Sequence, residues 1–199
     1  MSEIYLIRHG EITQFTPRCF VGQRDLPLTD RGRSQMRQVA GYLAHKGVRR
    51  LLCSPLSRCV ESAAIVGSVL GLRPEAVPDL REIALGDWEG LTVQEVRERF
   101  PGEYEARGRD LSGFRPPGGE SFADVQHRAW AAFETLSDFN APQAVVAHGG
   151  VNRVLLCRIL GMPLENLFRL EQDYACVNLL QAHEGGYRVG KLNASALTG

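Results

Sequence analysis

Short apolar runs that alternate with longer segments of helical periodicity are the feature that most constrains the fold of this chain. Ile4–Ile7, Leu51–Cys53 and Ala144–Ala147 are short and apolar, as expected of buried strands, and helical spacing follows each of them. Further strands are expected at Ala76–Val77 and, as an antiparallel pair, at Val177–Leu180 and Tyr187–Val189. This pattern is typical of an α/β domain, here a three-layer α/β/α sandwich with a mostly parallel central sheet.

The helices that follow these strands carry recognisable start signals. Thr29 is expected to cap a helix that ends near Gly47, and Ser54 is expected to cap another with Pro55 at its first position. Their expected apolar faces are Met36, Val39, Ala40 and Leu43, and Val60, Ala63, Ala64, Gly67 and Leu70. Three more helices are expected over about Thr92 to Phe100, from Ser121 onward and over Val151–Leu160.

The length and composition fit one domain spanning residues 1–199. The chain has 199 residues, of which 44% are apolar, and a chain of this size can bury a core without disulfides or structural metals. Its 23 basic residues balance its 23 acidic ones, whereas a nucleic-acid or membrane surface needs excess basic charge. We therefore expect neither kind of partner, although the balance is compatible with a local anion pocket.

The cysteines and the apolar runs point to the cytoplasm. The five cysteines form an odd set without CxxC spacing, so they indicate neither a disulfide framework nor a metal-ligand array. The first apolar run reaches Arg8 too early for a secretory signal. No apolar run approaches the roughly 20 residues that span a bilayer. The sequence does not determine the oligomeric state, and a homodimer is compatible with it.

Chemically useful side chains stand at the ends of three predicted strands. Arg8-His9-Gly10 follows the first strand, the segment 54–58 follows the second, and His148-Gly149-Gly150 follows the third. In parallel sheets the ligand crevice lies beyond the carboxyl ends of the strands. We therefore expect these three segments to meet around one ligand.

The first of these segments combines a nucleophile with an anion-binding group. A neutral histidine such as His9 can attack phosphorus and form a covalent intermediate, and its ordinary pKa near neutrality supplies that form. The guanidinium of Arg8 matches two phosphate oxygens at once, and Gly10 would let the backbone approach an anion closely. The tripeptide by itself is also compatible with a chance match around a surface histidine.

Arg58 and His148 are candidates for the same anion site, and each also has a plainer explanation. Arg58 lies in the first turn of a helix, where free N–H groups and partial positive charge favour anions. It is equally compatible with an exposed arginine that pairs with Glu61. His148 would donate to a phosphate oxygen in the transition state, or it would be a core histidine at a strand end.

A leaving alkoxide needs a proton, and one Gly-rich segment offers three acidic candidates for the donor. Glu82, Asp87 and Glu89 all lie within it. A carboxyl group held partly protonated would act there as a general acid. The spacing does not choose among the three, and all of them are also compatible with solvated loop acids.

Six segments then give a more specific pattern. They are LIRHGE at 6–11, LPLTDRG at 26–32, SPLSRCVESA at 54–63, LREIALGDWEG at 80–90, PPGGES at 116–121 and VVAHGG at 145–150. In this order they resemble the histidine phosphatase superfamily, in its phosphoglycerate mutase-like branch. The resemblance covers most of the chain to about residue 160, and the segments together are highly specific.

The resemblance implies a role for each candidate residue. It implies that His9 is the phosphorylated nucleophile, that Arg8, Arg58 and His148 bind the phosphoryl group, and that Glu82 is the proton donor. The expected substrate-binding set is Arg8, Gly10, Gln23, Arg58, His148 and Gly149. The resemblance also implies that no metal is needed, and no cofactor is expected.

This chain departs from the family pattern at one position. Four residues beyond Glu11 the family usually has an asparagine, and this chain has Phe15. The departure bears on the geometry of that loop and leaves the chemistry unchanged. Thr13, Gln14 or Thr16 would be able to supply the lost contact.

The expected function is hydrolysis of a small phosphorylated metabolite through a phosphohistidine. The compact length, the PLT…G segment and PPGGES look most like the α-ribazole-5'-phosphate phosphatases of cobalamin synthesis. A phosphoglycerate mutase is the alternative among enzymes. This chain has arginines at Arg97, Arg99, Arg107 and Arg109, but their spacing does not match that of the paired arginines of mutases. A catalytically inactive phospho-ligand-binding domain is the alternative of another class, and the complete catalytic set disfavours it.

Overall fold

A computed structural model describes residues 2–13, 16–136, 141–183 and 185–196. One six-stranded sheet has the order β3-β2-β4-β1-β5-β6. The strands are β1 (Ser2–Arg8), β2 (Arg50–Cys53), β3 (Glu75–Ala76), β4 (Gln143–Ala147), β5 (Val177–His183) and β6 (Gly186–Ala194). The first four are mutually parallel, and β5 is antiparallel to both β1 and β6. The mostly parallel sheet and the antiparallel pair are therefore confirmed.

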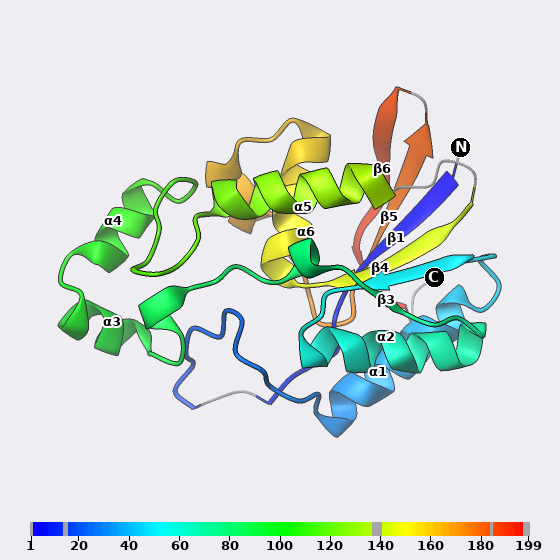
Figure 1. Cartoon of the computed structure of the whole chain (residues 1–199), viewed down its shortest axis with the longest axis horizontal. Coiled ribbons are helices and arrows are strands. Elements are labelled where there is room, and N and C mark those ends of the chain that lie inside the picture. Colours follow the sequence, from blue (N-terminus) through cyan, green and yellow to red (C-terminus); the bar gives the residue numbers. More distant parts are fainter. Residues whose placement is uncertain (1, 14–15, 137–140, 184, 197–199) are drawn as a thin grey trace.

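Helices cover both faces of this sheet and make the three expected layers (Figure 1). On one face lie α1 (Asp30–Leu43) and α2 (Ser57–Leu70), and on the other lie α5 (Phe122–Leu136) and α6 (Gly149–Leu160). Successive side chains of β1 point to opposite faces, so Ile4 and Leu6 pack into the core under α5 and α6. Tyr5 and Ile7 pack into the core under α1 and α2.

The remaining helices lie outside the three layers. In the described part of the chain these are α3 (Val93–Arg99) and α4 (Glu103–Arg109). Short 3-10 turns stand at Pro78–Leu80, Gly86–Trp88 and Leu164–Arg169, the first in contact with α5 and the last with α6. Figure 1 shows α3 and α4 together, beyond the end of the sheet. The sequence predicted α3 but not α4, because α4 buries none of its residues and so has no apolar periodicity.

Two helix starts agree with the sequence, and a third is shifted. The Thr29 side chain accepts a hydrogen bond from the N–H of Gly32 at 3.0 Å, which confirms it as the cap of α1. Thr92 and Glu95 form a reciprocal capping box on α3. α6 begins at Gly149, two residues earlier than expected and directly after His148. This earlier start puts His148 at the N-cap position of α6.

The prediction for α2 was wrong in its cap and in its buried face. Ser54 does not cap the helix, which begins at Ser57 after Leu56. The N–H of Ser54 is taken by the carbonyl of Val146, so the chain is still bonded as sheet at this position. The buried face is shifted as well, because Val60 is 41% exposed. The polar residues Arg58 and Ser62 are buried in its place at the carboxyl edge of the sheet.

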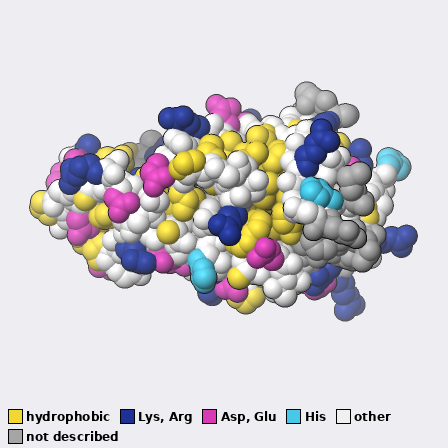
Figure 2. All heavy atoms as spheres, turned by 90° about the horizontal axis from the view of Figure 1, so that it is seen from above, with side chains coloured by type: hydrophobic (Ala, Val, Ile, Leu, Met, Phe, Trp, Pro, Cys, Tyr) yellow, Lys and Arg dark blue, Asp and Glu magenta, His cyan; other side chains and the backbone are white. Residues whose placement is uncertain are grey.

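The outer face above α5 shows no concentration of one charge (Figure 2). Basic and acidic side chains are scattered over it, and hydrophobic side chains gather across its middle. In the part of the chain that the structure describes, no helix combines the length and the apolar character that crossing a membrane requires.

Candidate active site

The carboxyl ends of β2, β4 and β1 bring the predicted segments together at one edge of the sheet. These strands are neighbours, and Arg8 lies opposite Ala147 in the sheet register. The N–H of His9 continues this ladder by donating to the carbonyl of Ala147 at 3.0 Å. The rings of His9 and His148 meet edge to face with centroids 5.2 Å apart. The expected convergence of these segments is therefore present in the fold.

His9 is held in the tautomer that a nucleophile requires. Its Nδ1 lies 2.8 Å from the carbonyl oxygen of Gly10, and because a carbonyl only accepts, the ring proton resides on Nδ1. Nε2 of the neutral ring is left with a free lone pair. Burial lowers the pKa of His9 well below its ordinary value, and the charges of Arg58 and Arg8 lower it further. The imidazole is thus neutral at pH 7.

Gly10 is a glycine because the backbone of α1 approaches it. A Cβ at this position would lie 2.5 Å from the carbonyl oxygen of Gly32 in the first turn of α1. Its N–H donates to Oγ of Ser62 at 3.2 Å. The predicted contact between this N–H and an anion would therefore have to replace the bond to Ser62.

Arg58 is a buried cation that is tied into the site. Only 1% of it is exposed, so the exposed-arginine explanation is wrong, and Glu61 pairs with Arg33 at 2.7 Å. The guanidinium donates from Nη1 to the carbonyl of Arg24 at 2.7 Å and from Nη2 to that of Gly22 at 2.8 Å. Arg58 therefore fixes the loop across the site as well as carrying charge into it.

His148 is fully buried beside Arg58. Nε of Arg58 donates to Nδ1 of His148 at 3.2 Å, which places the ring proton on Nε2, 2.7 Å from Oγ of Ser54. Burial lowers the pKa of His148 well below its ordinary value, and the charge of Arg58 adds to the effect. A donation from Nε2 to a phosphate oxygen would have to replace the bond to Ser54.

Arg8 has a buried hydrogen-bond donor still to be satisfied. Nη1 donates to the carbonyl of Gln172 at 2.5 Å, and the guanidinium carbon lies 4.0 Å from the ring centroid of Tyr174. Nε is buried and has no hydrogen-bond partner in the described ranges of the chain. An unpaired buried donor is costly, and an anion would satisfy it.

A cavity of about 450 Å³ opens beside this arginine. Its walls include Arg8, Arg18, Cys19 and Tyr174. The ring of Tyr174 lines this cavity and also lies 5.6 Å from the ring of His9. The sequence did not indicate Tyr174, because it lies in a connection between a 3-10 turn and β5 that carries no motif.

The structure separates the three acidic candidates. Oε2 of Glu82 accepts from the N–H of Gly150 at 3.0 Å, two residues beyond His148. Oε1 of Glu89 instead accepts from the N–H groups of Gln23 and Leu85, at 2.8 and 3.1 Å. Asp87 is exposed. Of the three, the carboxyl group of Glu82 is the one that contacts the turn after His148.

Gln23 and Gly149 contact site residues in ways that the sequence did not show. Nε2 of Gln23 donates to the backbone carbonyl of Glu82 at 2.9 Å. A Cβ on Gly149 would lie 3.4 Å from Nε of Arg8 and 3.1 Å from Nη1 of Arg153. Arg153 is an additional cation that sequence reasoning missed, and burial lowers its pKa. Phe15 lies outside the described residues.

Comparison with known proteins decides the family. The model of the histidine phosphatase superfamily (branch 1) matches residues 4–195, nearly the whole chain.

The chain belongs to the histidine phosphatase superfamily.

Relatives of this histidine phosphatase match it over most of their length. Adenosylcobalamin/alpha-ribazole phosphatase of Escherichia coli K12 is 30% identical over 98% of this chain and 97% of its own. Glucosyl-3-phosphoglycerate phosphatase of Mycolicibacterium vanbaalenii is 34% identical over 83% of this chain and 77% of its own. The structure of the alpha-ribazole phosphatase from Shigella flexneri superposes with a TM-score of 0.88 at 28% identity, covering 97% of this chain and 96% of that one.

These findings confirm the family, the fold class and the phosphatase activity that the sequence predicted. Among the residues that the structure describes, no group of three or more His, Cys, Asp or Glu side chains is placed to hold a metal ion. Arg8, Arg58 and Arg153 are cations of this candidate site.

Proposed function

We propose that this phosphatase hydrolyses a small phosphorylated metabolite through a covalent phosphohistidine at His9. Nε2 of His9 attacks phosphorus, the bond between phosphorus and the ester oxygen breaks, and Glu82 gives its proton to the leaving oxygen. Water then attacks the phosphohistidine, and the same carboxylate takes a proton from that water as inorganic phosphate leaves. The observation that carries the proposal is the Nδ1 bond to Gly10, which leaves Nε2 unprotonated beside two guanidiniums.

Arg8, Arg58 and His148 are proposed to hold the phosphoryl oxygens, on which the transition-state charge is spread. Nε of Arg8 and two N–H groups of Arg58 have no acceptor among the described residues, and these donors are available for this role. An anion between these groups would also offset the repulsion between two closely placed cations.

The substrate that we propose is α-ribazole 5'-phosphate. The relatives named for that activity in E. coli and S. flexneri align with nearly the whole of this chain and of their own. The cavity of about 450 Å³ beside Arg8 has the size of small-molecule sites.

A phosphoglycerate mutase is a weaker candidate. It would need arginines of the region 91–113 over the cavity to hold a substrate carboxylate. Arg97 instead pairs with Glu105 at 2.8 Å. The guanidinium carbon of Arg107 lies 5.9 Å from the ring centroid of Phe122 and 5.8 Å from that of Phe168. Neither arginine lines the cavity.

A rapid-quench experiment tests the covalent step. With p-nitrophenyl phosphate, the enzyme should release a burst of p-nitrophenol equal to the active sites and gain one phosphoryl group, located on His9 by mass spectrometry. The variant His9→Ala should show neither the burst nor turnover. Turnover near the wild-type rate in His9→Ala would contradict the proposal, and a phosphate-binding domain without catalysis would show no turnover in either protein.

Substrate preference is tested separately. The kcat/KM for α-ribazole 5'-phosphate should exceed that for glucosyl-3-phosphoglycerate and for 3-phosphoglycerate. A higher value for either of the other two would overturn the substrate assignment and leave the covalent mechanism intact.

The proposal also covers the cellular compartment and the oligomeric state of the enzyme. All five cysteines are free, as expected in a reducing compartment, and we propose the cytoplasm. The homodimer stays a prediction, which light scattering on the purified protein would test.

A further inference from the structure

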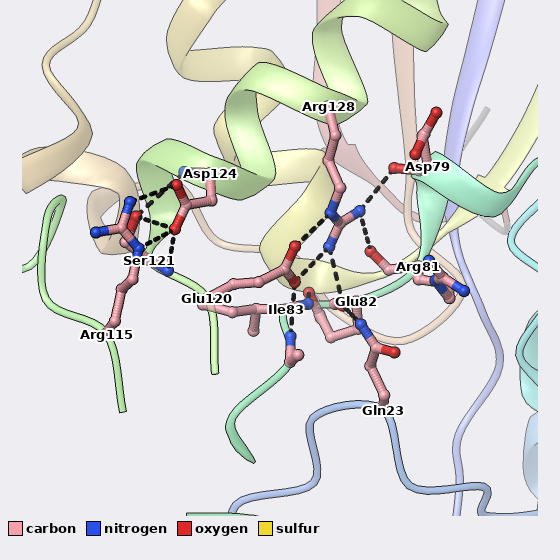
Figure 3. A network of polar contacts seen from close by, with 11 residues as sticks. Gln23, Asp79, Arg81, Glu82, Ile83, Arg115, Glu120, Ser121, Asp124 and Arg128 are labelled. Atoms are coloured by element: carbon pink, nitrogen blue, oxygen red, sulfur yellow. Dashed lines mark hydrogen bonds and ion pairs between the residues drawn. The ribbon is translucent and has the colours of Figure 1, made fainter. Parts of the chain in front are cut away.

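The side chain of Arg128 is surrounded by acceptors that belong to the segment 79–82 and to Glu120 (Figure 3). Nε and Nη2 donate to the two carboxylate oxygens of Glu120 at 2.7 and 2.9 Å. Nη1 donates to the carbonyls of Asp79 and Arg81 at 2.7 and 2.8 Å, and Nη2 donates to that of Glu82 at 3.1 Å. These contacts use all five N–H donors of the guanidinium.

Glu120 bonds the backbone on the other side of Glu82, at Ala84. While Oε2 accepts from Arg128, it also accepts from the N–H of Ala84 at 2.9 Å. Burial raises the pKa of Glu120, but the bonds from Arg128 and Ala84 outweigh burial and lower it overall. The carboxylate therefore stays charged, and the pair fixes the backbone on both sides of Glu82.

The side chain of Glu82 is held as firmly as its backbone. Oε1 accepts from the N–H of Ile83 at 3.0 Å and Oε2 from that of Gly150, so the carboxyl group is directed at the start of α6. Gln23 adds a second donor to the Glu82 carbonyl from the opposite side (Figure 3). A small rotation of the segment 79–82 would break several of these bonds together.

We propose that the Arg128–Glu120 pair is a positioning device for the proton donor, Glu82. The inference rests on the proposed function, in which Glu82 protonates the leaving oxygen. In this network Arg128 and Glu120 bond only to each other and to residues 79–84, so both act through Glu82. Arginine is required because its planar fork reaches three carbonyls and a carboxylate at once, whereas the ammonium of lysine has three donors on one atom.

A second arginine pair near the start of α5 offers a matched control. Arg115 donates to both oxygens of Asp124 at 2.6 and 2.7 Å, so this pair is also bidentate. Arg115 and Asp124 are more exposed than Arg128 and Glu120, and Asp124 also bonds Ser121 at the start of α5 (Figure 3). Loss of this pair therefore tests an ion pair on α5 without disturbing Glu82.

The readout is the dependence of kcat/KM on the leaving group. Phenyl phosphate and p-nitrophenyl phosphate have nearly the same shape, but phenolate is basic, like the tyrosine side chain with its pKa near 10, and needs a proton. Nitrophenolate is a far weaker base and leaves without one. A displaced acid therefore slows phenyl phosphate selectively, whereas general damage to the fold slows both substrates.

The experiment compares Arg128→Lys, Glu120→Gln and the control Arg115→Lys. In Arg128→Lys and in Glu120→Gln, kcat/KM for phenyl phosphate should fall at least about tenfold further than that for p-nitrophenyl phosphate, as expected for a misplaced catalytic group. In Arg115→Lys the ratio should stay within about twofold of the wild-type value, because an exposed pair contributes little. Circular dichroism would establish that each variant is folded.

Glu82→Gln separates this inference from the proposed function. It should give the same selective loss, and adding Arg128→Lys to it should leave the substrate ratio unchanged. If Glu82→Gln is selective but neither Arg128→Lys nor Glu120→Gln is, the positioning role is overturned and the acid role stands. If Glu82→Gln slows both substrates equally, the acid role fails and the positioning role with it.

Discussion

At the scale of single residues, the site depends on how two buried imidazoles are prevented from taking up protons. Nδ1–H of His9 donates a hydrogen bond to the carbonyl of Gly10, and Nδ1 of His148 accepts one from Nε of Arg58. Both rings are buried among guanidiniums, which makes the charged form of either ring costly. His9 is thereby left with an unprotonated Nε2, and His148 with its proton on Nε2.

Arg58→Ala should slow the enzyme strongly, because it removes a buried cation and releases the loop that Arg58 holds at Gly22 and Arg24. The expected loss of transition-state stabilisation is about 2.7–4 kcal/mol, or about 10²–10³ in kcat. Steady-state kinetics with p-nitrophenyl phosphate would measure it. Arg33→Ala, which removes a partly exposed pair on the neighbouring helix, is the control and should change kcat little. A loss below tenfold in Arg58→Ala would contradict the role.

The lowered pKa values of His9 and His148 predict that both rings stay neutral at pH 6. In the urea-unfolded chain, histidines with an ordinary pKa of about 6.5 are mostly protonated at that pH. Ring signals in nuclear magnetic resonance spectra of the folded and unfolded protein, recorded from pH 8 to 5, would show the difference. Protonation of both rings near pH 6.5 in the folded protein would refute the predicted environment.

The same shifts predict how stability depends on pH. Below about pH 6.5 the unfolded chain binds protons on these two histidines that the folded chain does not bind. The free energy of unfolding should therefore be highest above that pH and fall as the pH drops below it. Urea titrations at pH 7.5 and 5.5, with His148→Gln as the comparison, would measure the slope. If the free energy of unfolding of His148→Gln depends on pH as steeply as that of the wild type, the predicted contribution of His148 is contradicted.

At the scale of elements, the start of α6 delivers two parts of the site. His148 occupies the N-cap position, and the N–H of Gly150 in the first turn holds the carboxyl group of Glu82. A Cβ on Gly150 would overlap Oε1 of Glu82, so this position is open only to glycine if the carboxyl group is to stay. The helix thus joins the edge of the sheet that carries His148 to the carboxyl group of Glu82.

Gly150→Ala should therefore displace Glu82 while leaving the helix intact, because the atom that must move is the end of a flexible side chain. The kcat/KM for phenyl phosphate should fall about tenfold further than that for p-nitrophenyl phosphate. Gly41→Ala in α1 is the control, since nothing lies near its added Cβ and the change favours the helix by up to about 1 kcal/mol. Equal kcat/KM ratios in both variants would contradict the prediction.

At the scale of the whole molecule, one sheet joins two cores. One core lies under α5 and α6 and contains Trp88, and the other lies under α1 and α2 and contains Cys53 and Cys59. The two cores take alternate side chains of the same strands, so neither core has a sheet of its own. We propose that residues 1–199 fold as a single domain.

A single domain predicts that both cores unfold in one cooperative transition. Tryptophan fluorescence would follow the first core, in which Trp88 is fully buried. Labelling of Cys53 and Cys59, read by mass spectrometry, would follow the second. The two urea curves should share one midpoint, and midpoints separated by more than the error of the measurement would indicate two units.

Local patterns in the sequence determined the strands, most helices and the three segments that contain His9, Arg58 and His148. These follow from the sequence because periodicity and capping act between residues that are close in the chain. The family resemblance selected Glu82, a choice that spacing had left open. The tertiary structure alone decided the contacts of Glu82 with Gly150, of His148 with Ser54, and of Arg128 with the segment 79–82. These contacts join residues 46 to 94 positions apart in the chain, and no local pattern encodes which side chains will meet across such distances.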